Sequence, residues 1–352
     1  RRVRLTDAMK TKQMSKALDS VSGGTATFNL GDVSTQGVRS EAIAINGQDG
    51  NGDFTGRITL NAGDISTAGQ YSTAVRIAQA QSATVIADSI TASGAGGAGV
   101  QIDVAGDATV DIAGAVNVLG GRNLLDEAVD GIRVNAGGAA TVRAGSVTTT
   151  AEDADGVDVS ANDVVVDVVG RITTSGDGAD GVHASGTRSV EIVVGGITTA
   201  GSGAHGVHAT GDGEISVSSS DIATAGAGAH GVWIEGDDEL SDVTDNVGRA
   251  VASGGGARGV LASGGDVSLS VGERLEGEVA AELTAGGDIE VLVHAGARLI
   301  GDNAGLLATS GTTTTIVNRG VIDTLAGYAI DTNGGGTSLV NEGALHGRIN
   351  LT

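Results

Sequence analysis

Four histidines recur at a fixed spacing near the middle of the chain, and they are the residues best suited to bind a metal. His183 and His208 stand 25 residues apart, as do His205 and His230. Neutral imidazole suits Zn, Ni or Cu, so imidazoles one repeat apart could share an ion with a carboxylate such as Asp180. The alternative is that duplication of a repeat has copied these residues into an exposed, partly charged row. The sequence leaves both interpretations open.

A second candidate site is the glycine-rich stretch GQDGNGDFTG at 47–56. It places Asp49, Asn51 and Asp53 in a D-x-N-x-D pattern, and alternate oxygen ligands around glycines suit a hard cation such as calcium. The EF-hand loop also requires a glutamate at its twelfth position, where this chain has Leu60, so the pattern is not an EF-hand. We predict either weak calcium binding or a plain acidic turn.

Residues for catalysis are harder to find. Carboxylates are frequent, but nothing in the sequence marks a pair with different proton affinities, and we interpret the acidic run at 236–245 as a solvated, irregular turn. Two Phe, two Tyr and one Trp are too few to line a sugar-stacking groove. No G-x-S-x-G motif is present. We predict no enzyme, no catalytic residues and no cofactor apart from the calcium considered above; a polysaccharide-acting β-helix enzyme is the alternative.

These candidate residues lie on a repeat of about 25 residues. Three consecutive copies, within 164–236, read VVVDVVGRITTSGDGADGVHASG, VEIVVGGITTAGSGAHGVHATG and ISVSSSDIATAGAGAHGVWIEG. A fixed period of this length is typical of a solenoid, in which each repeat stacks on the next. The apolar residue that opens the Thr-rich phrase serves as an anchor for each turn. The anchors are Val33, Ile65, Ile90, Val116, Val147, Ile172, Ile197, Ile222, either Val247 or Ala250, Leu275, Leu299, Ile322 and Leu345.

Each repeat contains three short segments with alternating apolar residues, such as V-E-I-V-V, I-T-T and G-V-H-A, followed by Gly, Ser, Asp or Asn. Alternation predicts strands with one face inward, and glycine allows the bends between them. We therefore predict an all-β parallel β-helix of about 13 turns with three short strands per turn. The absence of proline agrees, because a strand paired on both sides needs its backbone N–H groups.

Composition limits the partners. The net charge of −23 and the pI near 4.4 argue against nucleic-acid binding, which needs a basic surface. The 61 glycines would fit disorder, but apolar residues on a fixed period indicate order. The absence of cysteine excludes disulfides and thiolate sites. No apolar run is long enough for a membrane-spanning helix, so we predict that this segment does not span a membrane.

We divide the chain into an N-terminal segment, 1–24, and a β-helix over 25–352 with insertions near 46–56 and 119–130. The N-terminal segment contains every lysine and spaces its apolar residues as in a helix, which predicts a cap over the open end of the solenoid. The alternatives are disorder or a basic docking element. Because no apolar stretch follows its charges, we expect that any export signal is missing from this sequence. Leu124 and Leu125 in the second insertion predict either a binding loop or a loop folded back on the solenoid.

Threonines form two further rows, at Thr148, Thr173 and Thr198 and at Thr149, Thr174 and Thr199. Regular threonine arrays can organise water, as in some ice-binding proteins. Adjacent residues of a strand point to opposite sides, so only one row can face solvent, and that row is broken at Asn117 and Ala223. We therefore do not expect ice binding.

The last turns repeat the pattern V-N-x-G-x-I/L, alternating with a G-x-A-I-D segment. The pattern is carried by Val317, Asn318, Gly320 and Ile322, and again by Val340, Asn341, Gly343 and Leu345. This style of repeat, over 25–352, resembles the passenger domains of autotransporters, the type V secreted proteins of bacteria. The resemblance implies an extended right-handed β-helix at the bacterial cell surface, attached to the outer membrane or released. Without a recognisable signal peptide or translocation region, we expect a passenger fragment or a differently exported relative.

We therefore predict a non-catalytic, secreted or cell-surface β-helical rod with an adhesive or structural role. Its partner would be a receptor on a host or neighbouring cell, or another copy of the chain. A different hypothesis is a self-assembling extracellular filament subunit that stacks end to end. The N-terminal segment would distinguish them, because a helix folded over the first turn blocks stacking and a free segment permits it.

Overall fold

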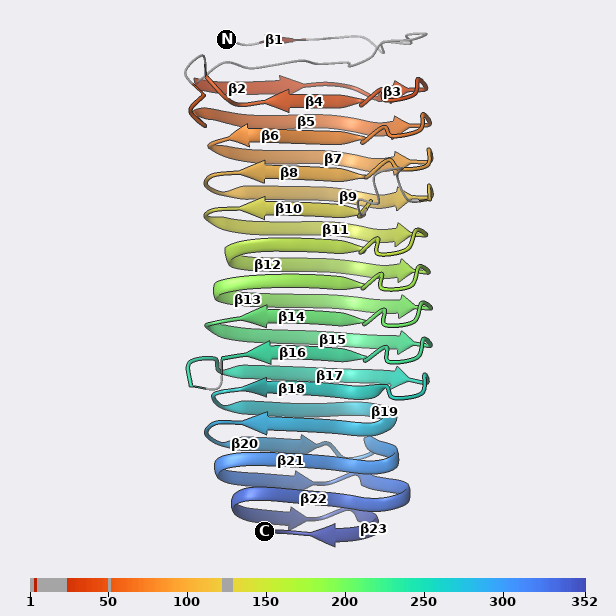
Figure 1. Ribbon diagram of the computed structural model, residues 1–352, viewed down its shortest axis with the longest axis vertical. Coiled ribbons are helices and arrows are strands. Elements are labelled where there is room, and N and C mark those ends of the chain that lie inside the picture. Colours follow the sequence, from red (N-terminus) through yellow and green to blue (C-terminus); the bar gives the residue numbers. More distant parts are fainter. Residues whose placement is uncertain (1–2, 5–23, 50–51, 122–128, 238) are drawn as a thin grey trace. The chain divides into compact units, whose positions relative to one another are not determined.

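The chain folds into stacked parallel strands, as the computed structural model in Figure 1 shows for residues 3–4, 24–49, 52–121, 129–237 and 239–352. All regular secondary structure in these residues is β-strand, and every pairing between the named strands given below is parallel. By its internal contacts the chain divides into unit 1, Arg1–Ala179, and unit 2, Asp180–Thr352, which we describe separately. Each unit is a β-solenoid, so the predicted fold class is confirmed.

Unit 1 contains twelve strands. They are β1 (Val3–Arg4), β2 (Gly24–Asn29), β3 (Val33–Thr35), β4 (Ile43–Asn46), β5 (Gly56–Thr67), β6 (Val75–Ala80), β7 (Ser82–Ala92), β8 (Val100–Val104), β9 (Ala108–Val118), β10 (Ile132–Ala136), β11 (Ala139–Thr149) and β12 (Val157–Thr174). Strands two apart in the chain pair with each other, as in β5–β7–β9–β11 and β4–β6–β8–β10. β1 pairs with β2. Of the predicted N-terminal cap, 1–24, only β1 and Gly24 belong to the described residues.

Unit 2 contains eleven strands arranged in the same way. They are β13 (Val182–Thr199), β14 (Val207–Gly211), β15 (Glu214–Thr224), β16 (Val232–Gly236), β17 (Val243–Ala252), β18 (Arg258–Gly264), β19 (Val267–Ala285), β20 (Ile289–Val293), β21 (Arg298–Asn318), β22 (Val321–Asn341) and β23 (Ala344–Asn350). Here β13–β15–β17–β19 and β14–β16–β18 form the ladders, and β19, β21 and β22 each run through successive sides of the coil.

The three segments of each turn are visible, although two of them usually join into one strand. In β7 the register with β9 shifts between Ala87 and Ile90, at the corner that separates the second segment from the third. The first segment is separate in most turns, as in β6 and β8. The alternating burial of β9 places one side of each segment inside and the other outside, as the sequence alternation predicts.

The core consists of apolar columns that run across the turns. The anchors Val33, Ile65, Ile90, Val116, Val147 and Ile172 are register partners in unit 1. The anchors Ile197, Ile222, Ala250, Leu275, Leu299, Ile322 and Leu345 are register partners in unit 2. Ala250, not Val247, therefore continues the column. Stacking of this kind lets many thin layers bury apolar area that no single turn could bury alone.

The predicted number of turns is too high. The described coils make about 11 turns instead of 13. Part of the difference is arithmetic, because a turn runs from one anchor to the next and the 13 anchors therefore bound 12 turns.

A buried threonine closes the tight turn after several of the Thr-rich segments. The Oγ1 atoms of Thr67, Thr149, Thr174, Thr199 and Thr224 donate to the carbonyl oxygen five residues later, over 2.6–2.8 Å. Glycine at φ +65° to +68° occupies a left-handed position in three of these turns, at Gly178, Gly203 and Gly228. One of the two predicted threonine rows therefore faces inward and helps to build the turns.

Candidate functional site

Two of the histidines and the tryptophan form a stacked column on β13, β14 and β16 of unit 2. His183 pairs in register with His208, and His208 with Trp233. The ring centroids are 5.0 Å apart between the histidines and 4.2 Å apart between His208 and Trp233, with interplanar angles of 9° and 6°. We call these three residues the His–Trp column. In-register pairing of parallel strands stacks the rings, because equivalent side chains lie about one strand spacing apart.

The other two histidines occupy a neighbouring column and bond to the backbone. Asp180 Oδ1 accepts the backbone N–H of His205 at 2.6 Å. His205 Nδ1 accepts the N–H of His230 at 3.0 Å, and His230 Nδ1 accepts the N–H of Arg258 at 3.0 Å. We call Asp180, His205 and His230 the backbone-bonding column. Because Nδ1 accepts in both histidines, the proton of each neutral ring lies on Nε2, and neither nitrogen offers a lone pair to a metal.

Burial favours the neutral form of both imidazoles, as these hydrogen bonds do. His205 is 8% exposed and His230 is 9% exposed. Burial lowers the pKa of His205, and the nearby histidines lower it further while Asp180 opposes them. Burial also lowers the pKa of His230 to about 4, with smaller contributions from His205 and Arg258. The backbone-bonding column therefore holds neutral imidazoles, and its first role is to join successive turns.

His208 lies between two carboxylates. Its Nδ1 is 3.6 Å from Asp180 Oδ2, and its Nε2 is 3.6 Å from Glu235 Oε2. Both distances exceed a direct hydrogen bond. Within either unit, no three His, Asp or Glu side chains of the described residues bring their ligand atoms together as one cation site. Metal binding by His183, His205, His208 and His230 stays a prediction, and the geometry favours a structural role for His205 and His230.

The first insertion forms a short closed loop. Gln48 and Phe54 make an antiparallel bridge, and Gly56 N–H donates to the Gly47 carbonyl at 2.9 Å. Asp49 Oδ1 accepts the N–H of Asp53 at 3.0 Å, so this carboxylate stabilises the turn. Asn51, the middle residue of the predicted calcium site, lies outside the described residues. Calcium binding by Asp49, Asn51 and Asp53 stays a prediction.

On either side of the second insertion, the described chain bonds to the neighbouring turn as far as Gly121 and again at Asp130. Leu124 and Leu125 lie outside the described residues, so the predicted binding loop is not tested. Asp130 is buried at 1% exposure, and its Oδ1 accepts the N–H of Asp155 at 2.9 Å. Burial, reinforced by the charges of Asp155 and Asp158, raises the pKa of Asp130 to about 8. Asp130 thus forms the same kind of bond in unit 1 that Asp180 forms in unit 2.

Asp245 corrects the interpretation of the acidic run at 236–245 as a solvated turn. It lies inward on β17, between its register partners Val217 and Leu269, and is 1% exposed. Neither carboxylate oxygen has a hydrogen-bond partner among the described residues. Burial alone raises the pKa of Asp245 to about 8, so this carboxyl is protonated below that pH. The run contains a core position as well as a turn, because β17 begins at Val243.

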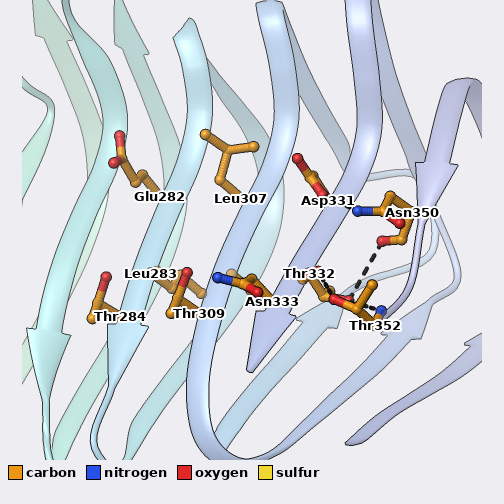
Figure 2. A pocket seen from close by; sticks show the side chains of 11 residues that line it. Glu282, Leu283, Thr284, Leu307, Thr309, Asp331, Thr332, Asn333, Asn350 and Thr352 are labelled. Carbon is orange, nitrogen blue, oxygen red and sulfur yellow. Dashed lines mark hydrogen bonds between the residues drawn. The ribbon is translucent and has the colours of Figure 1, made fainter. Parts of the chain in front are cut away.

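A further functional candidate in unit 2 is a groove on the outward side of β19, β21, β22 and β23, with a volume of about 450 Å³. Figure 2 shows its side chains in two rows across the strands. One row contains Glu282, Leu307, Asp331 and Asn350, and the other contains Thr284, Thr309 and Asn333. Thr352 lies beside these two rows, and its Oγ1 donates to the Thr332 carbonyl oxygen. We call this feature the unit 2 groove.

The chemistry of the unit 2 groove is polar and lacks a cation in its lining. Glu282 Oε2 accepts from Arg258 Nε at 2.5 Å, and Asp331 Oδ1 accepts from Asn350 Nδ2 at 2.7 Å. Threonine hydroxyls and asparagine amides can both donate and accept hydrogen bonds. The groove can therefore hold a ligand through many directional hydrogen bonds on a floor of in-register strands.

Sequence reasoning missed the unit 2 groove. Its first row continues the column of His183, His208 and Trp233, by way of Leu261 and Glu282. The repeat could have placed these residues in one column. It could not indicate a hollow, because a groove depends on the sizes of neighbouring side chains and on the course of the sheet.

The chain matched no protein-family model, no curated protein and no solved structure. Among the described residues, no helical segment has the length and apolarity needed to cross a membrane.

Proposed function

We propose that this chain is a non-catalytic scaffold displayed at a cell surface, where it adheres to another cell through the unit 2 groove. The observation that carries the proposal is the groove itself, about 450 Å³ in volume and lined by residues of four paired strands. Sites built on paired strands hold their side chains more rigidly than sites on loops. A volume of roughly 300–1,000 Å³ is typical of small-molecule sites.

The polar residues outside the groove support a scaffold role. His205 and His230 bond to the backbone of the next turn, and Thr199 closes a turn. These side chains, of types that can bind metals or ligands, stabilise the stacked turns. The display at a cell surface is supported by composition, since a cysteine-free chain with a net charge of −23 suits an environment exposed to solvent and cations. The repeat style that resembles autotransporter passengers supports the same location.

The proposal is tested by coating beads with the folded chain and measuring their retention under flow on bacterial and mammalian cell layers. We expect retention several-fold above that of beads coated with heat-denatured chain. Equal retention of the two bead types on every cell layer would overturn the proposal. Beads that clump with one another but ignore cells would also overturn it, in favour of self-association. Release of reducing ends from a polysaccharide panel by the purified chain would contradict the non-catalytic part.

A further inference from the structure

We infer that the unit 2 groove binds an uncharged, hydroxyl-rich ligand, a neutral oligosaccharide. The inference rests on the proposed adhesive function and names the ligand class for the same site. It starts from the two rows of outward side chains in Figure 2. Neighbouring members of a row stand one strand spacing apart, about 4.8 Å, and the two rows are about 7 Å apart along each strand. This grid of polar groups suits a ligand with hydroxyl groups at regular intervals.

The polar groups of the grid match hydroxyl groups. Glu282 and Asp331 each have one oxygen held by a neighbouring side chain, at 2.5 Å and 2.7 Å, which fixes the orientation of the carboxylate. A carboxylate accepts up to about four hydrogen bonds, so each can accept more from a ligand that donates. Thr309 and Asn333, which are register partners, can donate as well as accept. A sugar hydroxyl does both, so it can bond to either kind of group.

An apolar side chain lies between the two carboxylates. Leu307 is the register partner of Glu282 on one side and of Asp331 on the other, and it is half-buried. A sugar ring presents C–H groups on one face and hydroxyls around its edge. With the C–H face on Leu307, the hydroxyls point toward the carboxylates on both sides. This alternation distinguishes a sugar from a ligand that is polar all over.

The negative charge of the groove and of the chain argues against an anionic ligand. The Asp331 carboxylate repels phosphate, sulfate and uronate groups, whereas Glu282 is ion-paired with Arg258, and the net charge of −23 adds to the repulsion. A small cation would use the carboxylates but not Leu307 or the threonines. The groove contains no aromatic ring, so we expect a dissociation constant on the order of 1 mM for one groove, well short of the tighter sites that have aromatic anchors. Display of many copies would raise the avidity by about 10²–10⁴.

The test is saturation-transfer NMR on the full chain with neutral gluco-, manno-, xylo- and chito-oligosaccharides, and with uronate and glucosamine oligomers as charged comparisons. We expect saturation transfer to at least one neutral oligomer. The signal should fall at least five-fold in a Thr284→Val, Thr309→Val variant. A Ser185→Ala, Thr210→Val variant is the control, because it removes hydroxyls from the same row outside the groove. Leu307→Asn gives a second groove variant, and unchanged thermal unfolding shows that each variant is folded.

Three results would overturn the inference: no transfer to any neutral oligomer at 10 mM ligand, stronger transfer to a charged oligomer, or equal loss in the groove and control variants. The proposed function is judged separately by bead retention. Retention on cells without binding of neutral oligosaccharides rejects the ligand class and leaves adhesion standing. Failure of bead retention rejects adhesion, whatever the groove binds.

Discussion

At the scale of single residues, the most consequential side chain is Asp245. A carboxyl at 1% exposure without a partner must be neutral, because burying an unpaired charge is costly. Its apolar register partners, Val217 and Leu269, show that the column accepts aliphatic side chains at this position. Asn318, also fully buried, illustrates the contrast: its Nδ2 donates to Asn341 at 2.8 Å and its Oδ1 accepts from Gly320.

We predict that the free energy of unfolding contains a term from Asp245 that decreases as the pH rises from about 4 to about 8. The pKa of this carboxyl is raised from 3.8 to about 8 in the folded chain, so the unfolded chain releases its proton first. The loss is on the order of 5 kcal/mol, complete above pH 8. Asp245→Leu removes the term and should unfold at higher denaturant concentration at pH 7, measured by circular dichroism.

Asp245→Asn separates titration from polarity. It removes the pH-dependent term but keeps a buried polar group, so it should stabilise less than Asp245→Leu at pH 7. If both variants kept the same dependence on pH as the unsubstituted chain, Asp245 would have to be ionised in the fold, and its position in the core would need another explanation.

We predict a term of the opposite sign from His230. Its pKa is lowered from 6.5 to about 4, so its contribution is present above pH 6.5 and is lost as the pH falls through 4. The loss is about 3 kcal/mol. His230→Asn keeps an acceptor for the N–H of Arg258 but cannot be protonated, so its unfolding free energy should change less between pH 7 and pH 4. His294→Asn, at an exposed position, is the control and should behave as the unsubstituted chain. Equal acid sensitivity in both variants would contradict this role.

At the scale of elements, many turns of the coil are held by a side chain that bonds to a backbone group. The threonine that closes the tight turn is one case, and the backbone-bonding column is another. Asparagine in the V-N-x-G pattern is a third, since Asn318 Oδ1 accepts the N–H of Gly320 and its Nδ2 donates to the Ala344 carbonyl at 3.1 Å. The pattern on which the family resemblance depends therefore has a local role in bending the chain.

We predict that Thr149→Val lowers the free energy of unfolding by about 1–2 kcal/mol. Valine keeps the shape and the strand preference of threonine, but it removes the donor to the Ala154 carbonyl, a buried bond of 2.7 Å. The neighbouring Thr148→Val is a matched control, because Thr148 points to the other side of β11 and should change stability by less than about 0.5 kcal/mol. Chemical denaturation measures both. Equal effects would show that the inward threonine does not hold the turn.

Much of this element-level structure follows from the sequence. Period and alternation correctly predict parallel strands, a solenoid and the register of the anchors, because identical turns can only stack with like residues together. Alternation from the core anchor Val147 also places Thr149 inward and Thr148 outward, in agreement with their burial, but it does not show that the Thr149 hydroxyl closes the turn. Period and alternation also do not reveal that His205 and His230 accept backbone N–H groups of the next turn. Histidine Nδ1 and aspartate Oδ1 both stand one bond beyond Cγ, so one acceptor replaces the other in the column that includes Asp180.

The candidate sites were less predictable than the fold for a physical reason. A metal site needs ligand atoms that converge, whereas a repeat places equivalent atoms in parallel, about one strand spacing apart. His183 and His208 follow this rule, with ring centroids 5.0 Å apart. The unit 2 groove depends on differences between turns, such as Leu307 between Glu282 and Asp331. A repeat pattern describes what the turns share, so it does not show those differences.

At the scale of the whole molecule, charge is distributed by the same stacking. Arginines stand opposite acidic residues on the next turn, as Arg249 does with Asp221 at 2.6 Å and Arg133 with Asp158 at 3.3 Å. The chain has 20 basic and 43 acidic residues, so most carboxylates lack a cationic partner and the net charge is −23. Repulsion among surface carboxylates opposes folding, and salt screens it over a Debye length of about 10 Å at 0.1 M.

We therefore predict that the melting temperature rises by several degrees between 10 mM and 300 mM NaCl. Calcium at constant ionic strength distinguishes a specific site from this screening. If Asp49 and Asp53 bind calcium with a dissociation constant of about 1 mM, 10 mM calcium adds about 1.4 kcal/mol. Asp49→Asn with Asp53→Asn should remove that increment and leave the effect of NaCl unchanged. A calcium increment that survives in this variant would locate cation binding elsewhere among the acidic residues. The absence of any increment in the unsubstituted chain would mean that the first insertion is an acidic turn, closed by the 3.0 Å bond from Asp53 N–H to Asp49.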